Sequence, residues 1–369
     1  MYPTISDFIQ DVFGVYIPLP IQTFGFFVAL AFLSGSWIIS KELKRKEKEG
    51  ILKVFIKDKI IGLKATPWQI LSSAVIGFII GFKLVEITFN YSDFVYNPQQ
   101  LILSSRGDLI GGILGAIVSS YAKYKDYAKK ALSEPKIIKE KIHPYEIVGN
   151  ITLIAALSGI LGAKIAHNLE NIDALLQDPI GQLLDFGGLS FWGGLIGAAP
   201  IVIWYCRKHN IHYTHICDSA APALLLAYAV GRLGCHFAGD GCWGTSNTCD
   251  IPEHINFLPD WIWHYDYKNG VSKPPDDLVY PTSIYESIMA TILFLLMWIT
   301  RKKISIPGML FSLYLIVAGL ERFLIEQIRV NPNWLGDFTQ AEIISLGLII
   351  SGSVIMFHLN KVSRNHLFQ

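Results

Sequence analysis

The chain has 369 residues, of which 51% are apolar and 17% are charged, and its mean hydropathy is +0.39. This is more apolar surface than one water-soluble core can hide, which excludes an ordinary soluble domain and indicates a polytopic membrane protein. The formal net charge of +1 gives no general attraction to nucleic acid, so the position of the basic residues along the chain matters more than their number.

Nine apolar runs are long enough to cross a bilayer as helices, which takes about 20 residues each. They lie at about 21–40, 68–90, 107–122, 146–167, 188–206, 216–237, 281–300, 307–329 and 340–360. The run at 107–122 is short and rich in glycine, so a re-entrant or tilted segment is its alternative. We expect an all-α, transmembrane helical bundle of about nine spans, forming a single membrane domain over residues 1–369.

The basic residues predict the orientation of these spans. The first 20 residues lack a basic start and a small-residue cleavage site, so no removable signal peptide is expected. Lysines are frequent at 41–64 and 123–141, and a basic triplet stands at 301–303, whereas 168–187 contains neither lysine nor arginine. By the positive-inside rule the N-terminus lies outside and the C-terminus in the cytoplasm. An odd number of spans agrees with that orientation.

A glycine-rich pattern occurs twice. Residues 111–116 match residues 193–198, and the spans before them correspond as well, since 67–70 resembles 144–147. We interpret residues 41–142 as an inserted or duplicated helix pair with lysine-rich cytoplasmic segments. The alternative is that small residues at this spacing only let membrane helices approach closely.

The segment 238–280 is expected to form a long outer loop. It is rich in Trp, Tyr, Pro and Asp, and it either caps a site or merely links two spans. Cys242 and Cys249 lie in this loop, where they could oxidise to a disulfide. The scattered histidines and the lack of a paired C-x-x-C give no zinc-site spacing, so no metal is expected.

Charged residues near the ends of two apolar runs are the strongest functional signal. Arg232 lies in segment 231–244 with His236 and Asp240, at the end of a membrane-length run. A charge within hydrocarbon costs about 2.5–3.5 kcal/mol on insertion scales, so an arginine there indicates a functional site by default. We expect Asp240 to pair with Arg232 and to align it.

A second charged group lies on a later run. Arg322, Glu326 and Arg329 recur at i, i+4 and i+7, which places them on one helical face. Together with Arg232 they indicate an anionic ligand inside the membrane. The alternative is that Arg322 and Arg329 reach the water boundary and pair with Glu326 for structural reasons alone.

Five ordered motifs resemble those of the bacterial prolipoprotein diacylglyceryl transferase family. They lie at 187–194, at Asp218 with 221–222, at 231–234 with 239–240, at 281–286 and at 322–329. The resemblance covers about residues 144–350, and the region around Phe24 is similar to the family's first helix. It implies seven family-like spans, to which a helix pair within 41–142 would be an addition.

The resemblance implies a transferase of the bacterial cytoplasmic (inner) membrane that acts in lipoprotein biosynthesis. Such an enzyme moves the diacylglyceryl group of phosphatidylglycerol to the lipobox cysteine thiol of a prolipoprotein signal peptide, forming a thioether and releasing glycerol 1-phosphate. The partners it implies are phosphatidylglycerol, prolipoprotein signal peptides and membrane lipids, with no cofactor and no nucleic acid. The family's essential arginine pair corresponds to Arg232 and Arg322, and the rigid guanidinium fork matches phosphate oxygens.

The chain departs from the family pattern where the thiol would be activated. Trp192 stands in place of the histidine that is the usual candidate base, Cys235 and His236 replace an asparagine, and Asp240 replaces a glutamate. Either His236, Asp240 or a water held by them takes the thiol proton, or the family histidine is dispensable. The alternative for His236 is a local hydrogen bond at a helix end.

Further residues complete the expected binding site. The Tyr285 hydroxyl could bond a headgroup or belong to an interfacial aromatic belt, Glu286 could hold an arginine, and Trp192 could stack on lipid or peptide. Gly193 and Gly194 would allow close packing or the approach of backbone to a headgroup. The expected catalytic set is Arg232, Arg322, Asp240 and His236, and the expected substrate-binding set is Arg232, Arg322, Glu326, Arg329, Tyr285, Glu286, Gly193, Gly194 and Trp192.

A non-catalytic phospholipid-binding or transporter-like membrane protein is the other function class that fits. A transporter built from repeats should show matching polar sites in both copies. The first copy offers Arg106 and Asp108 but nothing like segment 231–244. This difference favours the transferase.

Overall fold

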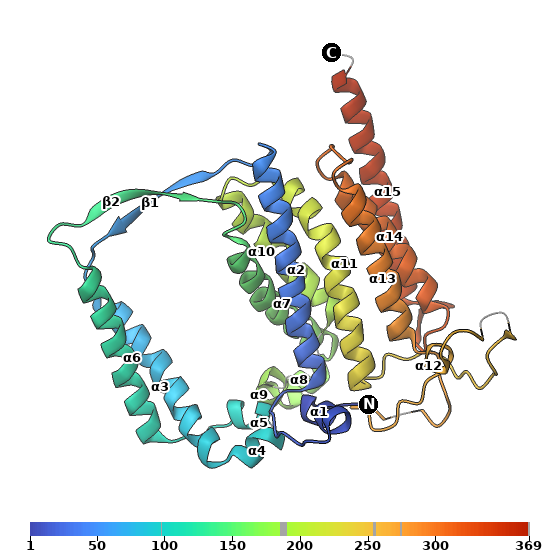
Figure 1. Cartoon of the computed structure of the whole chain (residues 1–369), viewed down its shortest axis with the longest axis horizontal. Helices are drawn as coiled ribbons and strands as arrows, with labels where there is room; N and C mark the ends of the chain where they lie inside the picture. The colour runs from blue at the N-terminus through green and yellow to red at the C-terminus, as the bar shows by residue number, and fades with distance from the viewer. Residues whose placement is uncertain (97, 185–189, 254–255, 274, 368–369) are drawn as a thin grey trace.

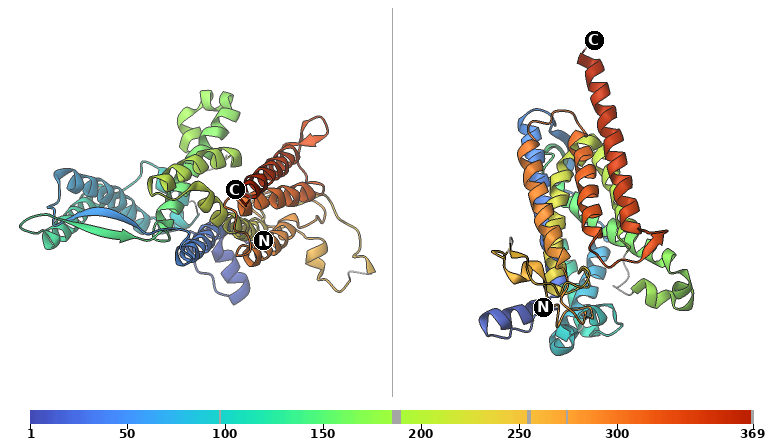
Figure 2. Two further views of the ribbon diagram at one scale, coloured as in Figure 1. Left: turned by 90° about the horizontal axis from the view of Figure 1, so that it is seen from above. Right: turned by 90° about the vertical axis from the view of Figure 1, so that its right-hand side faces the viewer.

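The structure is a computed structural model that describes residues 1–96, 98–184, 190–253, 256–273 and 275–367. Most of the long helices lie side by side in one bundle, and α3 and α6 stand to one side of it (Figures 1 and 2). The long helices are α2 (Thr23–Lys48), α3 (Pro67–Phe89), α6 (Leu109–Lys130), α7 (Val148–Glu170), α10 (Phe191–Lys208), α11 (Tyr213–Ala238), α13 (Thr282–Thr300), α14 (Met309–Glu326) and α15 (Gln340–Leu367). The short helices are α1 (Ile5–Phe13), α4 (Tyr91–Tyr96), α5 (Pro98–Leu103), α8 (Ile172–Gln177), α9 (Pro179–Leu184) and α12 (Asp260–Trp263). The strands are β1 (Phe55–Ile61), β2 (Lys136–Ile142), β3 (Asn333–Leu335) and β4 (Phe338–Thr339).

The apolar runs of the sequence correspond to the long helices. Within the described ranges, 6 helices, namely α2, α3, α7, α11, α13 and α15, are long and apolar enough to cross a membrane. A mostly helical, polytopic membrane protein is therefore confirmed. Helix α6 is unbroken over 22 residues and packs along α3, which argues against a re-entrant segment at 107–122.

The expectation of an all-α fold is wrong in detail, because three of the connecting segments contain antiparallel strands. Strands β1 and β2 pair along their full length and connect the α3–α6 pair to the bundle (Figure 1). Isoleucines and charged residues mix in both strands, and Lys59 Nζ lies 2.8 Å from Glu140 Oε1 across the ribbon. Branched side chains and opposite charges on facing strands favour this pairing. Strands β3 and β4 form a small hairpin before α15.

The helix pairs α3–α6 and α7–α10 are built alike. In each pair two short helices follow the first long helix, α4 and α5 in one case and α8 and α9 in the other. A Cβ atom added at Gly81 would lie 2.1 Å from the Gly111 carbonyl oxygen, and one at Gly162 would lie 2.3 Å from that of Gly193. Glycine is required at both crossings because any side chain would push the helices apart.

The N-terminus and the loop between α11 and α13 lie at the same end of the bundle (Figure 1). The Tyr2 backbone N–H donates to the Phe237 carbonyl at 2.8 Å. Strands β1 and β2, the loop after α13 and the C-terminus lie at the opposite end. The lysine-rich segments thus gather at one end of the bundle.

Candidate active site

Glu286, near the start of α13, is completely buried and faces three arginines. Its Oε2 lies 2.8 Å from Arg232 Nε, an ion pair whose N–H is not aligned as a hydrogen bond. Its Oε1 accepts hydrogen bonds from Arg322 Nη1 at 3.0 Å and from Arg329 Nη1 at 3.2 Å. Arg322 Nη2 also lies 2.7 Å from Glu326 Oε2, one helical turn further on. We call these five residues the arginine cluster; it brings the two charged groups of the sequence together.

Backbone contacts hold the helices that carry the arginine cluster. Next to Glu286 the Ser287 hydroxyl donates to the Ala229 carbonyl of α11 at 2.9 Å, which fixes α13 against α11. Arg329 follows α14, and its backbone forms a bridge with Gly244 of the segment between α11 and α13. A Cβ atom at Gly244 would lie 2.6 Å from the Ile328 carbonyl oxygen, so this bridge requires a glycine.

The prediction that Asp240 pairs with Arg232 is wrong, because Glu286 takes that place. Gly239 ends α11 with a left-handed φ of 64°, a conformation natural to glycine, and the chain turns there before it reaches Asp240. Asp240 Oδ1 is buried and has no hydrogen-bond partner among the described residues.

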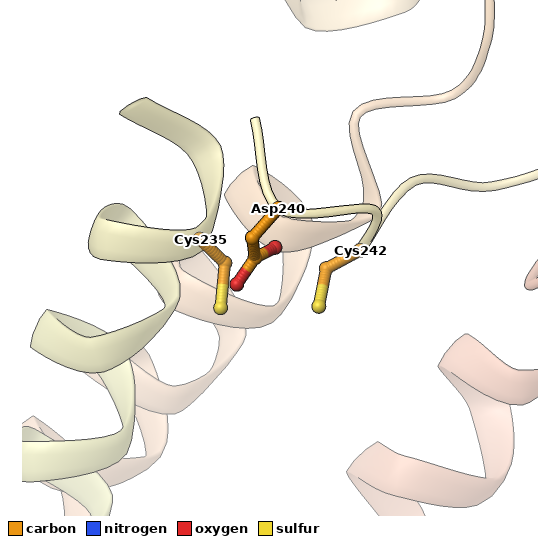
Figure 3. Close-up of side chains that lie close together, drawn as sticks. All are labelled: Cys235, Asp240 and Cys242. Carbon is orange, nitrogen blue, oxygen red and sulfur yellow. The ribbon is translucent and has the colours of Figure 1, made fainter. Parts of the chain in front are cut away.

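Two cysteines lie beside this aspartate. The ligand atoms of Cys235, Asp240 and Cys242 are all within 4.8 Å of one another (Figure 3). Thiol and carboxylate groups suit a soft divalent cation, but Arg232 Nη1 lies 3.4 Å from Cys242 Sγ and 3.9 Å from Cys235 Sγ, and its charge opposes a second cation there. The hydrogen bond from Cys235 and the charge of Arg232 lower the pKa of the Cys242 thiol. All five cysteines are free, so the suggested disulfide between Cys242 and Cys249 is not formed.

A cavity of about 710 Å³ lies beside the arginine cluster, between α10, α11, α14 and α15. This volume is in the range of small-molecule sites, about 300–1,000 Å³. Its charged lining is Arg232, Glu321, Arg322 and Glu326. Its apolar lining includes Trp192, Leu224, Leu225, Ala318, Ile344 and Leu348. The combination suits a ligand that is anionic at one part and apolar at another.

His236 is not among the described residues that line this cavity. It is buried, and its Nδ1 lies 3.0 Å from the Tyr267 hydroxyl, which in turn is 3.4 Å from Ser283 Oγ. The Tyr265 ring packs against the imidazole at 4.8 Å between centroids. The structure thus gives His236 the local hydrogen bond that was its alternative role. Through Tyr267 the segment 238–280 packs against the ends of α11 and α13.

Other residues of the expected binding site have structural partners. The Tyr285 hydroxyl donates to the Ile262 carbonyl at 2.6 Å, which holds α12 against α13. Gly193 packs against Gly162, and a Cβ atom at Gly194 would lie 3.4 Å from the nearest backbone oxygen of α7. Of this group Trp192 lines the cavity. Residues 187–189, which begin the glycine-rich motif, lie outside the described residues.

Sequence reasoning missed several polar residues of the cavity wall, among them Glu321 and Tyr228. Glu321 on α14 is 5% exposed, and its Oε1 is buried with no hydrogen-bond partner among the described residues. The Tyr228 hydroxyl is buried in the same way, and the Arg232 guanidinium lies 5.0 Å from the Tyr228 ring centroid. The available signal for Glu321 was an acidic residue inside an apolar helix, directly before Arg322.

Comparison with known proteins agrees with this geometry. The family model described as prolipoprotein diacylglyceryl transferase matches residues 113–358, more than half of the chain. A protein named phosphatidylglycerol–prolipoprotein diacylglyceryl transferase from Clostridium tetani is 30% identical over 226 residues, which cover 60% of this chain and 84% of the relative. The corresponding transferase 2 of Clostridium perfringens is 29% identical over 272 residues, 71% of this chain and 93% of the relative. This chain belongs to the prolipoprotein diacylglyceryl transferase family.

Proposed function

We propose that the chain carries out the reaction of its family at the arginine cluster and the adjoining cavity. A diacylglyceryl group passes from phosphatidylglycerol to the lipobox cysteine of a prolipoprotein signal peptide, forming a thioether, and glycerol 1-phosphate leaves. The enzyme works in the bacterial cytoplasmic membrane at the first step of lipoprotein maturation. The observation that carries the proposal is the pair of cationic side chains, Arg232 and Arg322, in the wall of a cavity with a largely apolar lining.

The charges of the arginine cluster suit a phosphodiester. Three arginines face two glutamates, Glu286 and Glu326, so the arginine cluster itself carries one net positive charge. Arg232 and Arg322 both reach the cavity, where their planar N–H groups can bond two phosphate oxygens. As the bond to the leaving phosphate breaks, negative charge grows on its oxygen, and fixed cations stabilise that charge strongly where water is scarce.

In the reaction, the cysteine thiolate attacks the glyceryl CH₂ carbon that carries the phosphate. A carbon–sulfur bond forms, the carbon–oxygen bond breaks, and the phosphate oxygen keeps the electron pair. The acyl chains would lie along the apolar walls of α11, α14 and α15. Glu286, Glu326 and Arg329 act here as positioning residues, since they hold the two phosphate-binding arginines.

The remaining residues of the expected site serve to build the cap. His236 and Tyr285 fix the outer loop through Tyr267 and the Ile262 carbonyl. Asp240 lies next to Cys235 and Cys242, the two cysteines that Arg232 contacts. The α3–α6 pair is proposed to be a duplicated copy of α7–α10, added to seven family-like spans within a single membrane domain.

The headgroup product tests the reaction directly. Purified protein is supplied with phosphatidylglycerol labelled in its terminal glycerol and with a lipobox peptide. Labelled glycerol 1-phosphate should accumulate in proportion to peptide, and a peptide with serine in place of the lipobox cysteine should release none. Release that does not depend on the cysteine would indicate a phospholipase and contradict the transfer.

Nine spans with the N-terminus outside predict which loops a membrane-impermeant maleimide reaches. In a Cys249→Ser background, which removes the exposed native cysteine, Lys268→Cys in the cap should be labelled in intact spheroplasts. Lys48→Cys at the end of α2 should be labelled only after the membrane is opened. Labelling of Lys48→Cys from outside would overturn the orientation.

His236→Ala should affect stability more than chemistry. The substitution removes the bond to the Tyr267 hydroxyl, and a lost buried hydrogen bond costs about 1–3 kcal/mol. The rate of transfer should stay within about tenfold of wild type, and Tyr267→Phe should behave alike. Thermal unfolding and turnover of both variants provide the test. A loss of about 10²–10⁴-fold for His236→Ala alone is the signature of a lost general base and would restore that role.

A further inference from the structure

Glu321 is an acidic residue of the cavity to which the reaction has so far given no role. It lies on α14 among side chains that are mostly apolar, and 5% of its surface is exposed. It lines the cavity together with Arg232 and Arg322. The carboxyl group is therefore next to the space where the phosphate and the incoming thiol must meet.

The partners of the cavity glutamates separate Glu321 from the others. Glu286 contacts three arginines and Glu326 contacts Arg322, so both carboxylates are used to hold cations. Glu321 Oε1 is buried and has no hydrogen-bond partner in the described part of the chain. A buried polar atom without a partner costs about 1–3 kcal/mol. A buried carboxyl group that lines a cavity and has no protein partner is one for which the substrate can be the partner.

The other candidate bases are less well placed. Trp192 cannot accept a proton, and His236 is held by Tyr267 away from the described cavity lining. Asp240 lies with the two cysteines and is likewise not among those lining residues. The other titratable groups that face the cavity are Tyr228, Tyr314, Arg232, Arg322 and Glu326. Of the two carboxyl groups among the described lining residues, Glu326 pairs with Arg322 and Glu321 pairs with no arginine.

We propose that Glu321 is the general base that takes the proton from the lipobox thiol. The inference rests on the proposed transfer reaction and names the acceptor that this reaction needs. The Cys S–H bond breaks and its proton moves to a Glu321 carboxylate oxygen. The resulting thiolate attacks the glyceryl carbon, and the phosphate oxygen leaves with the electron pair of the carbon–oxygen bond. The proton on Glu321 is then available to the departing phosphate, which resets the carboxylate.

Charge supports a proton acceptor inside the cavity. If the thiol proton went to bulk water, the thiolate would add one uncompensated negative charge to a site that already holds the lipid phosphate. Transfer to Glu321 neutralises one carboxylate as the thiolate forms, so the net charge of the cavity does not change. Because an added charge is expensive in a poorly solvated site, this path has the lower cost.

A peptide whose nucleophile needs no base tests the role. Glu321→Gln keeps the size of the side chain and removes the proton acceptor. With a cysteine lipobox peptide, kcat should fall by about 10²–10⁴-fold, the usual contribution of a general base. With a selenocysteine peptide, whose selenol is already ionised at neutral pH, the ratio of variant to wild-type kcat should return to within about tenfold of one. The KM for phosphatidylglycerol should change little in either case.

The outcomes separate this inference from the reaction on which it rests. No product from wild type with either peptide would reject the transfer itself. Product from wild type, with Glu321→Gln equally impaired on both peptides or unimpaired on both, would overturn Glu321 as the base. Glu321→Asp keeps a carboxylate and should retain more activity on the cysteine peptide than Glu321→Gln, which distinguishes lost chemistry from a damaged fold. Glu86→Gln, in α3 outside the cavity, is the matched carboxylate-to-amide control and should be indistinguishable from wild type on both peptides.

Discussion

Glu286→Gln should abolish most of the transferase activity and should also destabilise the protein. The carboxylate is the shared partner of Arg232, Arg322 and Arg329, and it has no exposed surface. Removing one member of a buried ion pair typically costs about 3–5 kcal/mol, because the remaining charges lose their compensation. If the activation free energy rises by the same amount, kcat/KM falls by about 10²–10⁴-fold, since each 1.36 kcal/mol corresponds to a factor of ten.

Thermal unfolding in detergent and kcat/KM for phosphatidylglycerol are the measurements for Glu286→Gln. Glu86→Gln again serves as the control for an amide placed in a membrane helix. If Glu286→Gln keeps wild-type stability and rate, the three arginines do not depend on this carboxylate. The arginine cluster would then not be held together by Glu286.

Arg232→Lys and Arg322→Lys should each lower kcat/KM by about 10- to 150-fold. Lysine keeps the charge but offers a point cation in place of a planar fork, so one of two parallel bonds to phosphate is lost. A hydrogen bond to a charged group contributes about 1.5–3 kcal/mol, which corresponds to that range. The two effects should not add in the double variant, because both arginines share Glu286 as a partner.

Steady-state turnover against phosphatidylglycerol concentration checks these two variants. Arg207→Lys provides the matched control, since Arg207 lies at the end of α10 over the Tyr213 ring and takes no part in the arginine cluster. Wild-type kcat/KM in both Arg232→Lys and Arg322→Lys would place the phosphate at another site.

The sequence predicts the helical part of this fold well, because a membrane restricts the possible structures. Every apolar run must become a helix to satisfy its backbone hydrogen bonds, so run length alone locates the long helices. The strands β1 and β2 were not predicted. They pair with each other across the whole α3–α6 pair, and neither segment shows a strict alternation of apolar and polar residues. Pairing across such a separation depends on tertiary structure more than on local sequence.

For the charged residues too, the sequence predicts contacts within one helix better than contacts between helices. The spacing of Arg322 and Glu326 correctly predicts a contact one helical turn apart, whereas Arg329 lies beyond the end of α14 and reaches Glu286 from a backbone bridge with Gly244. The partner of Arg232 was misassigned, since Asp240 is close in sequence whereas Glu286 approaches only when α13 packs on α11. Glu321 was overlooked because adjacent residues point about 100° apart around a helix, so Glu321 is not expected on the face of Arg322. The cavity is wide enough that both side chains line it, which the sequence does not reveal.

The most direct test of the central claim is the mass of a lipobox peptide after incubation with purified protein and phosphatidylglycerol. The account predicts that the peptide gains the mass of one diacylglyceryl unit, that the gain sits on the lipobox cysteine as a thioether stable to hydroxylamine, and that Glu286→Gln lowers its rate together with both arginine variants. A peptide that binds with phosphatidylglycerol but keeps its mass, under conditions in which another member of the family modifies it, would contradict the transfer and would favour a lipid-binding protein without turnover.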